Sequence, residues 1–249
     1  MTLLKIKGLV KSFGALQVLD HVSLDLEKGG LHSVIGPNGA GKTTLFNVIC
    51  GHLLPDLGAV EFEGRNIVGL KPYDIAHLGI GRSFQIKNIF PALTVLENIR
   101  IAVQLCQKGN FNIFKKVYTR RDLIENSLEI LDRVGLSSRA HWEAKKLAYG
   151  EQKTLDVAIA LATDPVLLLL DEPTSGLAPQ ETNRMIELIK EINQDIAILL
   201  IEHKMKMVMS ISDKITVLHQ GKVISEGMPS VVQSDALVRS AYLGDVESA

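Results

Sequence analysis

A glycine-rich segment near the amino terminus has the residue types and spacing of a phosphate-binding loop. Its glycines allow the backbone to turn with the amide groups facing inward, where phosphate oxygens can accept their hydrogen bonds. The lysine near its end supplies a positive charge for the β- and γ-phosphates, and the threonine after it supplies a hydroxyl for Mg²⁺. We expect the following residues to bind a nucleotide: Gly36, Pro37, Asn38, Gly39, Ala40, Gly41, Lys42, Thr43 and Thr44.

The residues around this loop predict the strand and the helix that such a loop requires. An apolar run, Leu31–Ile35, comes before it, and residues 44–50 continue it as a helix. A helix that begins near Lys42 directs the positive end of its dipole at the bound phosphates. The alternative is a glycine turn before an ordinary helix. Because Lys42 and Thr43 both stand in register with the motif, the phosphate site is favoured over that alternative.

Two acidic residues follow a second apolar run. Residues 166–170 are all aliphatic, and Asp171 and Glu172 come directly after them. A buried strand would place Asp171 at its carboxyl end, where open α/β sheets bind ligands, so Asp171 is a candidate ligand of Mg²⁺. Glu172 is expected on the other side of the pleat, as a candidate to polarise a water molecule toward the γ-phosphate. The alternative is a strand end made polar for solubility.

The overall composition is that of an ordinary globular protein. Of 249 residues, 46% are hydrophobic and 22% are charged, and the formal net charge of −1 gives no general attraction to nucleic acid. Cys50 and Cys106 form no spacing motif, which fits a reducing compartment. The start of the chain lacks the layout of a signal peptide. Each aliphatic run is far shorter than the roughly 18 residues of a membrane helix, so we expect no membrane span.

The hydrophobic pattern predicts two kinds of strand. Residues 4–7, 22–26 and 59–63 alternate apolar with polar side chains, which is typical of half-buried antiparallel strands. Uninterrupted apolar runs at 31–35, 166–170 and 196–201 are typical of strands buried on both faces, as in a parallel sheet. Helical spacing of apolar residues marks 151–163 and 179–193. We therefore predict an α/β fold with a mostly parallel core sheet and an amino-terminal antiparallel β subdomain.

The middle of the chain is expected to be mostly helical. Thr94 and Glu97 have the spacing of a capping box, and residues 121–134 carry apolar side chains at helical spacing. The chain would then leave a sheet near Gln85, run through helices and return near Val166. We predict one domain over residues 1–249, with a helical subdomain inserted at roughly 87–163.

Five segments, in order, resemble the motifs of ATP-binding cassette (ABC) ATPases, which have the P-loop NTPase fold. Besides the phosphate loop, these are the Q-loop at residues 82–85, the signature at 147–152, the Walker B and D-loop segment at 171–177 and the switch-histidine loop at 201–203. The resemblance implies that the nucleotide is ATP, that Mg²⁺ accompanies it, and that the protein hydrolyses it.

The resemblance also implies roles for single residues. Phe13 matches the aromatic residue that stacks on adenine, whereas without the family a core role would be favoured. Gln85 matches the residue that touches Mg²⁺ or the attacking water. His203 matches the residue that contacts the γ-phosphate and holds Glu172 and water in line. The implied catalytic residues are Glu172, His203, Gln85 and Lys42, and the implied metal ligands are Thr43, Gln85 and Asp171.

The signature segment is expected to serve a second subunit. In the family, the residues that match Tyr149 and Gly150 lie where a helix begins and caps the γ-phosphate held by the partner, so that ATP joins two cassettes. Four departures from the family pattern stand out: Ala148 in place of Ser, Tyr149 in place of Gly, Ala178 in place of a frequent Asp, and Ile159 in place of a common Arg. We expect hydrolysis to survive these changes, with weaker communication between signature and D-loop.

Within the family, the sequence is similar to the ATPases of branched-chain amino acid importers. The signature variant, the helix after His203 and the tail at 241–245 resemble that branch, although Lys204 stands where the branch usually has Asp. The resemblance implies a place at the cytoplasmic face of the membrane. The implied partners are a second ATPase subunit, two permease subunits and an external solute-binding protein. Phe90, Pro91 and Leu93 would then dock the permease or belong to the core.

Several alternatives remain open at the level of sequence. Related amides, urea or an exported lipid are possible cargoes, and the cassette could pair with itself or with a sibling subunit. A soluble ABC switch in translation or DNA repair usually has two cassettes, a long coiled coil or a basic patch, none of which the chain has. A non-hydrolysing scaffold is disfavoured because Glu172 and His203 are present. A GTPase would need an Asn-Lys-x-Asp segment, which the chain lacks.

Overall fold

The computed structural model describes residues 1–83, 89–106 and 121–243. Within these ranges no helix is long and apolar enough to cross a membrane. The strands are β1 (Thr2–Phe13), β2 (Leu16–Glu27), β3 (Leu31–Ile35), β4 (Leu57–Phe62), β5 (Arg65–Asn66), β6 (Ile80–Arg82), β7 (Leu167–Asp171), β8 (Ala197–Ile201), β9 (Lys214–His219) and β10 (Lys222–Gly227). The helices are α1 (Lys42–Ile49), α2 (Pro72–His77), α3 (Val95–Cys106), α4 (Arg121–Arg133), α5 (Tyr149–Leu161), α6 (Pro179–Asn193), α7 (Met205–Ile211), α8 (Pro229–Ser234) and α9 (Ala236–Leu243), with 3₁₀ turns η2 (Ser137–Arg139) and η3 (Ala144–Lys146).

The amino-terminal strands form the predicted antiparallel sheet, in the order β2-β1-β4-β5. Over residues 4–7 of β1 the side chains alternate as expected: Leu4 and Ile6 are buried, Lys5 is half-buried and Lys7 is exposed to solvent. The buried side chains of this sheet share one hydrophobic cluster with α1. Half-buried strands therefore lie over the helix that follows the phosphate loop.

The core sheet has the order β10-β9-β3-β8-β7-β6, and every neighbouring pair in it is parallel except β10 with β9. Every position of β3, β7 and β8 is buried, as the uninterrupted apolar runs predict. On β7, Leu167 and Leu169 face the cluster that contains α1, whereas Leu168 and Leu170 face a cluster that contains α5 and α6. The core sheet is thus a middle layer, which confirms the predicted fold class.

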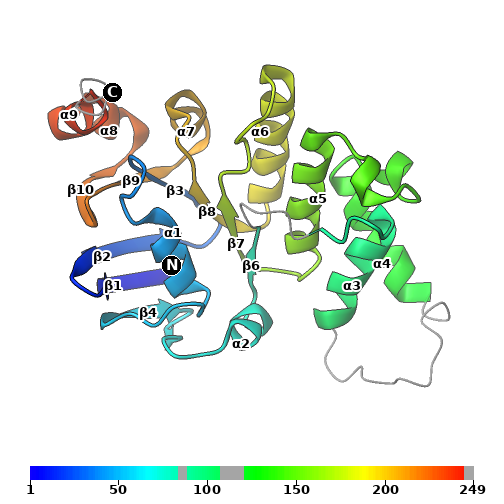
Figure 1. Ribbon diagram of the computed structural model, residues 1–249, viewed down its shortest axis with the longest axis horizontal. Coiled ribbons are helices and arrows are strands. Elements are labelled where there is room, and N and C mark those ends of the chain that lie inside the picture. The colour runs from blue at the N-terminus through cyan, green and yellow to red at the C-terminus, as the bar shows by residue number, and fades with distance from the viewer. Residues whose placement is uncertain (84–88, 107–120, 244–249) are drawn as a thin grey trace.

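Helices α3, α4 and α5 lie together on one side of the molecule, and α8 and α9 lie on the opposite side (Figure 1). The chain leaves the core sheet at the end of β6 and returns to it at β7, so α3, α4 and α5 fall in the stretch where we predict an inserted subdomain. The capping box predicted there is present: the Thr94 amide donates to the Glu97 carboxylate (2.8 Å), and the Glu97 amide donates to the Thr94 hydroxyl (3.1 Å).

Helix α5 begins at Tyr149, two residues before the predicted start at Glu151. The Glu151 carboxylate accepts a hydrogen bond from the Ala148 amide (3.0 Å), which extends the helix toward its amino terminus. Gly150 therefore lies in the first helical turn. The strands β9 and β10 and the helices α8 and α9 near the carboxyl end were not expected from the sequence.

Two glycines bring the antiparallel sheet against the phosphate loop. A Cβ added to Gly41 would lie 2.6 Å from the Val18 carbonyl oxygen, and one added to Gly221, between β9 and β10, would lie at the same 2.6 Å from that oxygen. Gly41 has φ of 103° and Gly221 has φ of 79°, which other residues rarely adopt. The Val18 carbonyl therefore packs closely against both the phosphate loop and the β9–β10 turn.

Candidate functional site

The phosphate loop runs from the end of β3 into α1, and its backbone requires glycine. Gly36 has φ of 153°, and a Cβ there would lie only 2.1 Å from the Leu218 carbonyl oxygen. Gly39 has φ of 81° and faces open space, and both Asn38 and Gly39 are exposed. The loop is thus fixed to the core sheet at its base, while its tip leaves backbone groups accessible to a ligand.

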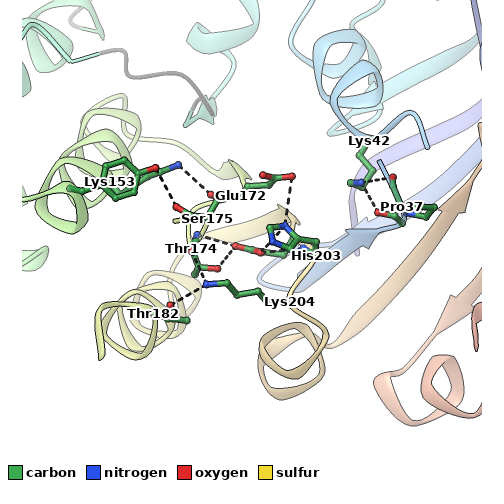
Figure 2. A network of polar contacts seen from close by, with 12 residues as sticks. Pro37, Lys42, Lys153, Glu172, Thr174, Ser175, Thr182, His203 and Lys204 are labelled. Carbon is green, nitrogen blue, oxygen red and sulfur yellow. Dashed lines mark hydrogen bonds and ion pairs between the residues drawn. The ribbon is translucent and has the colours of Figure 1, made fainter. Parts of the chain in front are cut away.

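Lys42 is buried at the mouth of this loop. Its ammonium donates hydrogen bonds to the carbonyl oxygens of Gly36 (2.6 Å) and Pro37 (2.9 Å), as Figure 2 shows. Burial lowers the pKa of Lys42, and the carboxylates of Glu172 and Asp171 oppose that shift. An ammonium has three N–H donors, so the two carbonyls leave one for a phosphate oxygen.

The first turn of α1 faces the same loop. Its N-cap, Gly41, provides no side-chain hydrogen bond, and no acidic residue lies in the first turn. The amides there and the helix dipole are consequently available to an anion. Thr43 is exposed and Thr44 is half-buried. The structure therefore gathers all nine residues that we predict to bind the triphosphate into one cradle.

Asp171 ends β7 and is almost fully buried, with 2% of its surface exposed. One carboxylate oxygen, Oδ2, lies 3.3 Å from the Arg82 guanidinium. The other, Oδ1, is buried and has no hydrogen-bond partner among the described residues. Burial raises the pKa of Asp171, and Arg82 opposes that shift. A buried oxygen without a partner is suited to a hard cation such as Mg²⁺, and the exposed Thr43 hydroxyl is a candidate for a second oxygen ligand.

Within the described ranges, no group of three or more His, Cys, Asp and Glu side chains is arranged to hold a metal ion. Mg²⁺ that arrives with a nucleotide keeps several waters and is held by one or two side chains together with substrate phosphates. Thr43 and Asp171 fit that pattern. Gln85, the third predicted ligand, lies outside the described residues.

Glu172 is the first residue beyond β7. Its φ of 50° is left-handed, so that a backbone turn, not the pleat of the strand, sets the direction of its side chain. Its amide donates to the Ile201 carbonyl at the end of β8 (2.9 Å), which brings it next to the switch-histidine loop. The Glu172 carboxylate Oε1 lies 3.8 Å from Nδ1 of His203, whose side chain is half exposed (Figure 2). The structure thus brings together these two predicted catalytic residues.

Tyr149 and Gly150 lie on another part of the same chain. The Tyr149 hydroxyl donates to the Ser175 carbonyl (3.3 Å), and Gly150 is so close to α6 that a Cβ there would lie 2.5 Å from a carboxylate oxygen of Glu181. In Figure 2, Lys153 of the same helix and Lys42 lie on opposite sides of Glu172. The structure therefore does not bring Tyr149 and Gly150 to the phosphate cradle of their own chain.

Phe13 is the last residue of β1 and is 48% exposed, which excludes the core role considered from its sequence alone. The Lys11 ammonium lies 5.6 Å from the centre of its ring. An exposed aromatic face on the hairpin whose Val18 carbonyl lies against Gly41 of the phosphate loop is suited to stacking on a base.

Sequence reasoning missed several polar residues around the strand ends. Arg82 contacts Asp171 and donates to the Asn47 side chain of α1 (2.7 Å), and Lys153 donates to the Glu172 carbonyl (3.3 Å). Glu202 and Lys204, on either side of His203, both contact Thr174. Two signals were available: the charged Arg82 at the end of a short strand, and Lys204, which departs from the pattern of the branch that the sequence resembles.

Three features together define a nucleotide-binding cassette. They are a phosphate loop between a buried strand and a helix, acids at the ends of the adjacent strands, and an antiparallel sheet beside them. Comparison with known proteins identifies the family within this class. Residues 19–175 match the ABC transporter family. The chain belongs to this family and is an ABC-type ATPase.

Similar proteins match the chain over almost its whole length. It is 40% identical to the high-affinity branched-chain amino acid transport ATP-binding protein LivG of Salmonella typhimurium, with 98% of each chain covered. It is 39% identical to BraF of Pseudomonas aeruginosa, of the same description, again over 98% of each chain. A solved ABC transporter cassette in its ADP conformation is similar with a TM-score of 0.89 and 34% identity, over 98% of this chain and 99% of that one. A dimeric cassette bound to ADP and Pi gives a TM-score of 0.79 and 25% identity, over 91% and 98%.

Proposed function

We propose that this chain is the ATPase subunit of a membrane importer for branched-chain amino acids or related amides. The observation that carries the proposal is the phosphate cradle of Gly36–Thr43 together with Oδ1 of Asp171, which is buried and has no hydrogen-bond partner in the described part of the chain, and the adjacent Glu172 and His203. The near full-length similarity to LivG and BraF supports the choice of cargo. It favours this reading over a lipid exporter or a soluble ABC switch.

In this proposal each part of the site has one task. The loop amides and Lys42 bind the triphosphate, and Phe13 stacks on the adenine. Thr43 and Asp171, with Gln85, would hold Mg²⁺, which when bound offsets the negative charge of the phosphates. Glu172 accepts a proton from the attacking water, and His203 holds the γ-phosphate and Glu172 in line. The end of β7 and the end of β8 position these last two side chains.

We further propose that two cassettes pair, so that Tyr149 and Gly150 of one chain cap the γ-phosphate bound by the other. Their separation from Lys42 within one chain supports this arrangement, as does the dimeric cassette that the chain resembles. Residues 1–249 would act as one domain with a helical insertion at roughly 87–163. In a complex with two permease subunits at the cytoplasmic face of the membrane, this insertion would dock the permease through Phe90, which is 51% exposed, Pro91, which is exposed, and the half-buried Leu93.

The test is reconstitution of the transporter. The chain would be expressed with permease subunits and the solute-binding protein encoded beside its gene, and placed in vesicles with ATP on the cytoplasmic side. We expect ATP-dependent uptake of labelled leucine, isoleucine or valine, and loss of that uptake with Glu172→Gln. Equal amino acid uptake with and without ATP would contradict the proposal. So would ATP-driven movement of a labelled lipid with no movement of amino acid.

A further inference from the structure

Thr174 connects the ends of strands β7 and β8. It is fully buried and lies two residues after Glu172. Its amide and its hydroxyl both donate to Oε1 of Glu202, at 2.9 and 2.6 Å, and its carbonyl accepts a hydrogen bond from the Lys204 ammonium at 2.8 Å (Figure 2). All three polar groups of Thr174 are therefore bound by the two residues on either side of His203.

These contacts lie just beyond the point where the pairing of β7 with β8 ends. The ladder between β7 and β8 ends at Asp171 and Ile201, and the Glu172 amide makes one more bond to Ile201. Glu172 and His203 both lie just past this end. The contacts of Thr174 with Glu202 and Lys204 continue the connection between the two segments where the sheet has stopped.

Glu202 is fully buried, and a buried carboxylate is costly unless hydrogen bonds and a nearby positive charge compensate it. Its second oxygen, Oε2, accepts from the His203 amide (3.2 Å), so the same side chain holds both Thr174 and the backbone of the switch histidine. Lys204 supplies a positive charge on the opposite side of Thr174. It also lies 3.2 Å from the Thr182 hydroxyl, which ties the segment to α6.

We propose that Glu202 and Lys204 are positioning residues for ATP hydrolysis, which hold Glu172 and His203 in the relative placement that the reaction needs. The inference rests on the roles proposed above for Glu172 and His203. The contribution of Lys204 depends on its ammonium, because a side chain without an N–H or O–H group has no proton to donate to the Thr174 carbonyl. Neither residue is expected to touch the nucleotide.

The proposal predicts a change in turnover without a change in ATP binding. The phosphate cradle is built from β3 and α1, which do not include Thr174, Glu202 or Lys204. Loss of the Lys204 contact would leave the Thr174 carbonyl with the Leu177 amide (3.3 Å) as its remaining donor among the described residues and would remove the contact with Thr182 of α6, while the cradle stays intact. Because small displacements of reacting groups can lower rates by up to about 10²-fold, we expect Lys204→Met to lower kcat by about tenfold. The KM for ATP should stay within about twofold of wild type, since an interaction that affects only the reacting geometry leaves binding unchanged.

The experiment compares Lys204→Met and Lys204→Arg with the matched control Lys206→Met in the purified full-length chain. Lys206 is exposed on the next helix and makes no hydrogen bond or ion pair with the described residues. Phosphate release gives kcat and KM, calorimetry gives ATP affinity, and thermal unfolding gives Tm. We expect Lys204→Arg to recover most of the lost turnover, because it keeps the donor and the charge, and Lys206→Met to match wild type.

A second pair of variants keeps the test decisive if Lys204→Met does not fold. Thr182→Val removes one acceptor of Lys204, and we expect it to lower kcat by about twofold to threefold. The double variant Lys204→Arg, Thr182→Val should have the same kcat as Lys204→Arg alone if the guanidinium at position 204 contacts the Thr174 carbonyl and not residue 182. Unchanged kcat in both Lys204→Met and Thr182→Val would overturn the proposal. So would a rise in KM alone, or a loss of kcat that follows Tm and is not recovered by Lys204→Arg.

The Glu172→Gln variant separates this inference from the proposed function. Normal turnover in Glu172→Gln would contradict the catalytic role of Glu172, and with it the basis of the positioning argument. Impaired turnover in Glu172→Gln together with normal kcat in Lys204→Met would leave the proposed function standing and would show that Lys204 is not a positioning residue.

Discussion

The buried ammonium of Lys42 is the residue on which nucleotide binding depends most. It is held at the mouth of the loop by two carbonyl oxygens, and burial lowers its pKa against the opposing effect of Glu172 and Asp171. A bound triphosphate would add negative charge beside it and favour its protonated form. The loop therefore fixes the place of this charge before the ligand arrives.

Replacement of this lysine should abolish tight binding. Hydrogen bonds to charged groups contribute about 1.5–3 kcal/mol each, so we expect Lys42→Ala to weaken ATP affinity by at least about 10-fold to 100-fold. Isothermal titration calorimetry measures the change, with Lys206→Ala as the control for loss of a lysine elsewhere. An ATP affinity equal to that of wild type would count against the cradle.

Glu172 is predicted to act in the chemical step only. We expect Glu172→Gln to lower turnover by roughly 10²–10⁴, the usual contribution of a general base, because the amide cannot accept the proton from water. Binding of ATP should be retained, since Glu172 lies at the end of β7 and not in the phosphate loop. A phosphate-release assay and calorimetry on the same preparation check both statements.

The sequence predicted some of these residues and not others, for physical reasons. The spacing of Gly36, Gly41 and Lys42 is dictated by one local turn, so the cradle could be predicted without knowledge of the fold. The direction of Glu172 could not, because it depends on a left-handed backbone at the end of β7. The contacts of Lys204 join residues about thirty positions apart, and only the parallel pairing of β7 with β8 brings them together.

At the scale of elements, strands buried on both faces were the easiest to predict. The bounds of β3 and α6 agree with the predicted 31–35 and 179–193, because apolar runs and helical spacing end sharply there. The start of α5 was placed two residues late, since Tyr149 and Gly150 are poor helix formers and the local capping contact of Glu151 with the Ala148 amide extends the helix beyond the apolar spacing. The insertion helices were expected, but their packing against α5 was not derivable from periodicity.

Strand β3 carries a buried histidine that should make the protein sensitive to acid. His32 is 1% exposed, and its Nε2 lies 2.8 Å from the Thr216 hydroxyl of β9. Burial, and secondly Lys214, lower the pKa of His32 from 6.5 to about 4. Between these values only the unfolded chain binds the proton, so acidification through this range favours unfolding.

We expect this histidine to cost up to about 3 kcal/mol of stability as pH falls from 6.5 to about 4, since each unit of pKa difference corresponds to about 1.4 kcal/mol. Urea unfolding at several pH values measures the free energy. The variant His32→Gln should lose this part of the pH dependence, whereas His77→Gln, at an exposed histidine, should keep it. Equal pH dependence in wild type and His32→Gln would contradict a neutral, buried imidazole.

At the scale of the whole molecule, the pairing that we propose gives each cassette two incomplete nucleotide sites. The cradle at β3 and α1 lacks the signature residues, and the start of α5 lacks a cradle. Two copies in head-to-tail contact would complete both sites, and ATP would lie between them. We therefore expect the chain to be mostly monomeric without nucleotide and to pair when ATP is bound.

Light scattering on the Glu172→Gln variant tests the pairing, because slow hydrolysis should keep ATP in place. We expect the average mass to rise toward that of a dimer with ATP and to stay near that of a monomer with ADP. A dimer that persists without nucleotide would contradict the view that ATP joins the two copies.

The carbonyl of Val18, held between Gly41 and Gly221, has a consequence for selectivity among nucleotides. It locks the hairpin that carries Phe13 to the loop that carries Lys42, so folding sets the span between the purine end and the phosphate end of the ligand. ADP and ATP would then share the same purine position. The contacts of ATP and ADP with the protein would then differ only at the γ-phosphate of ATP, which would lie next to the residues that follow β7 and β8.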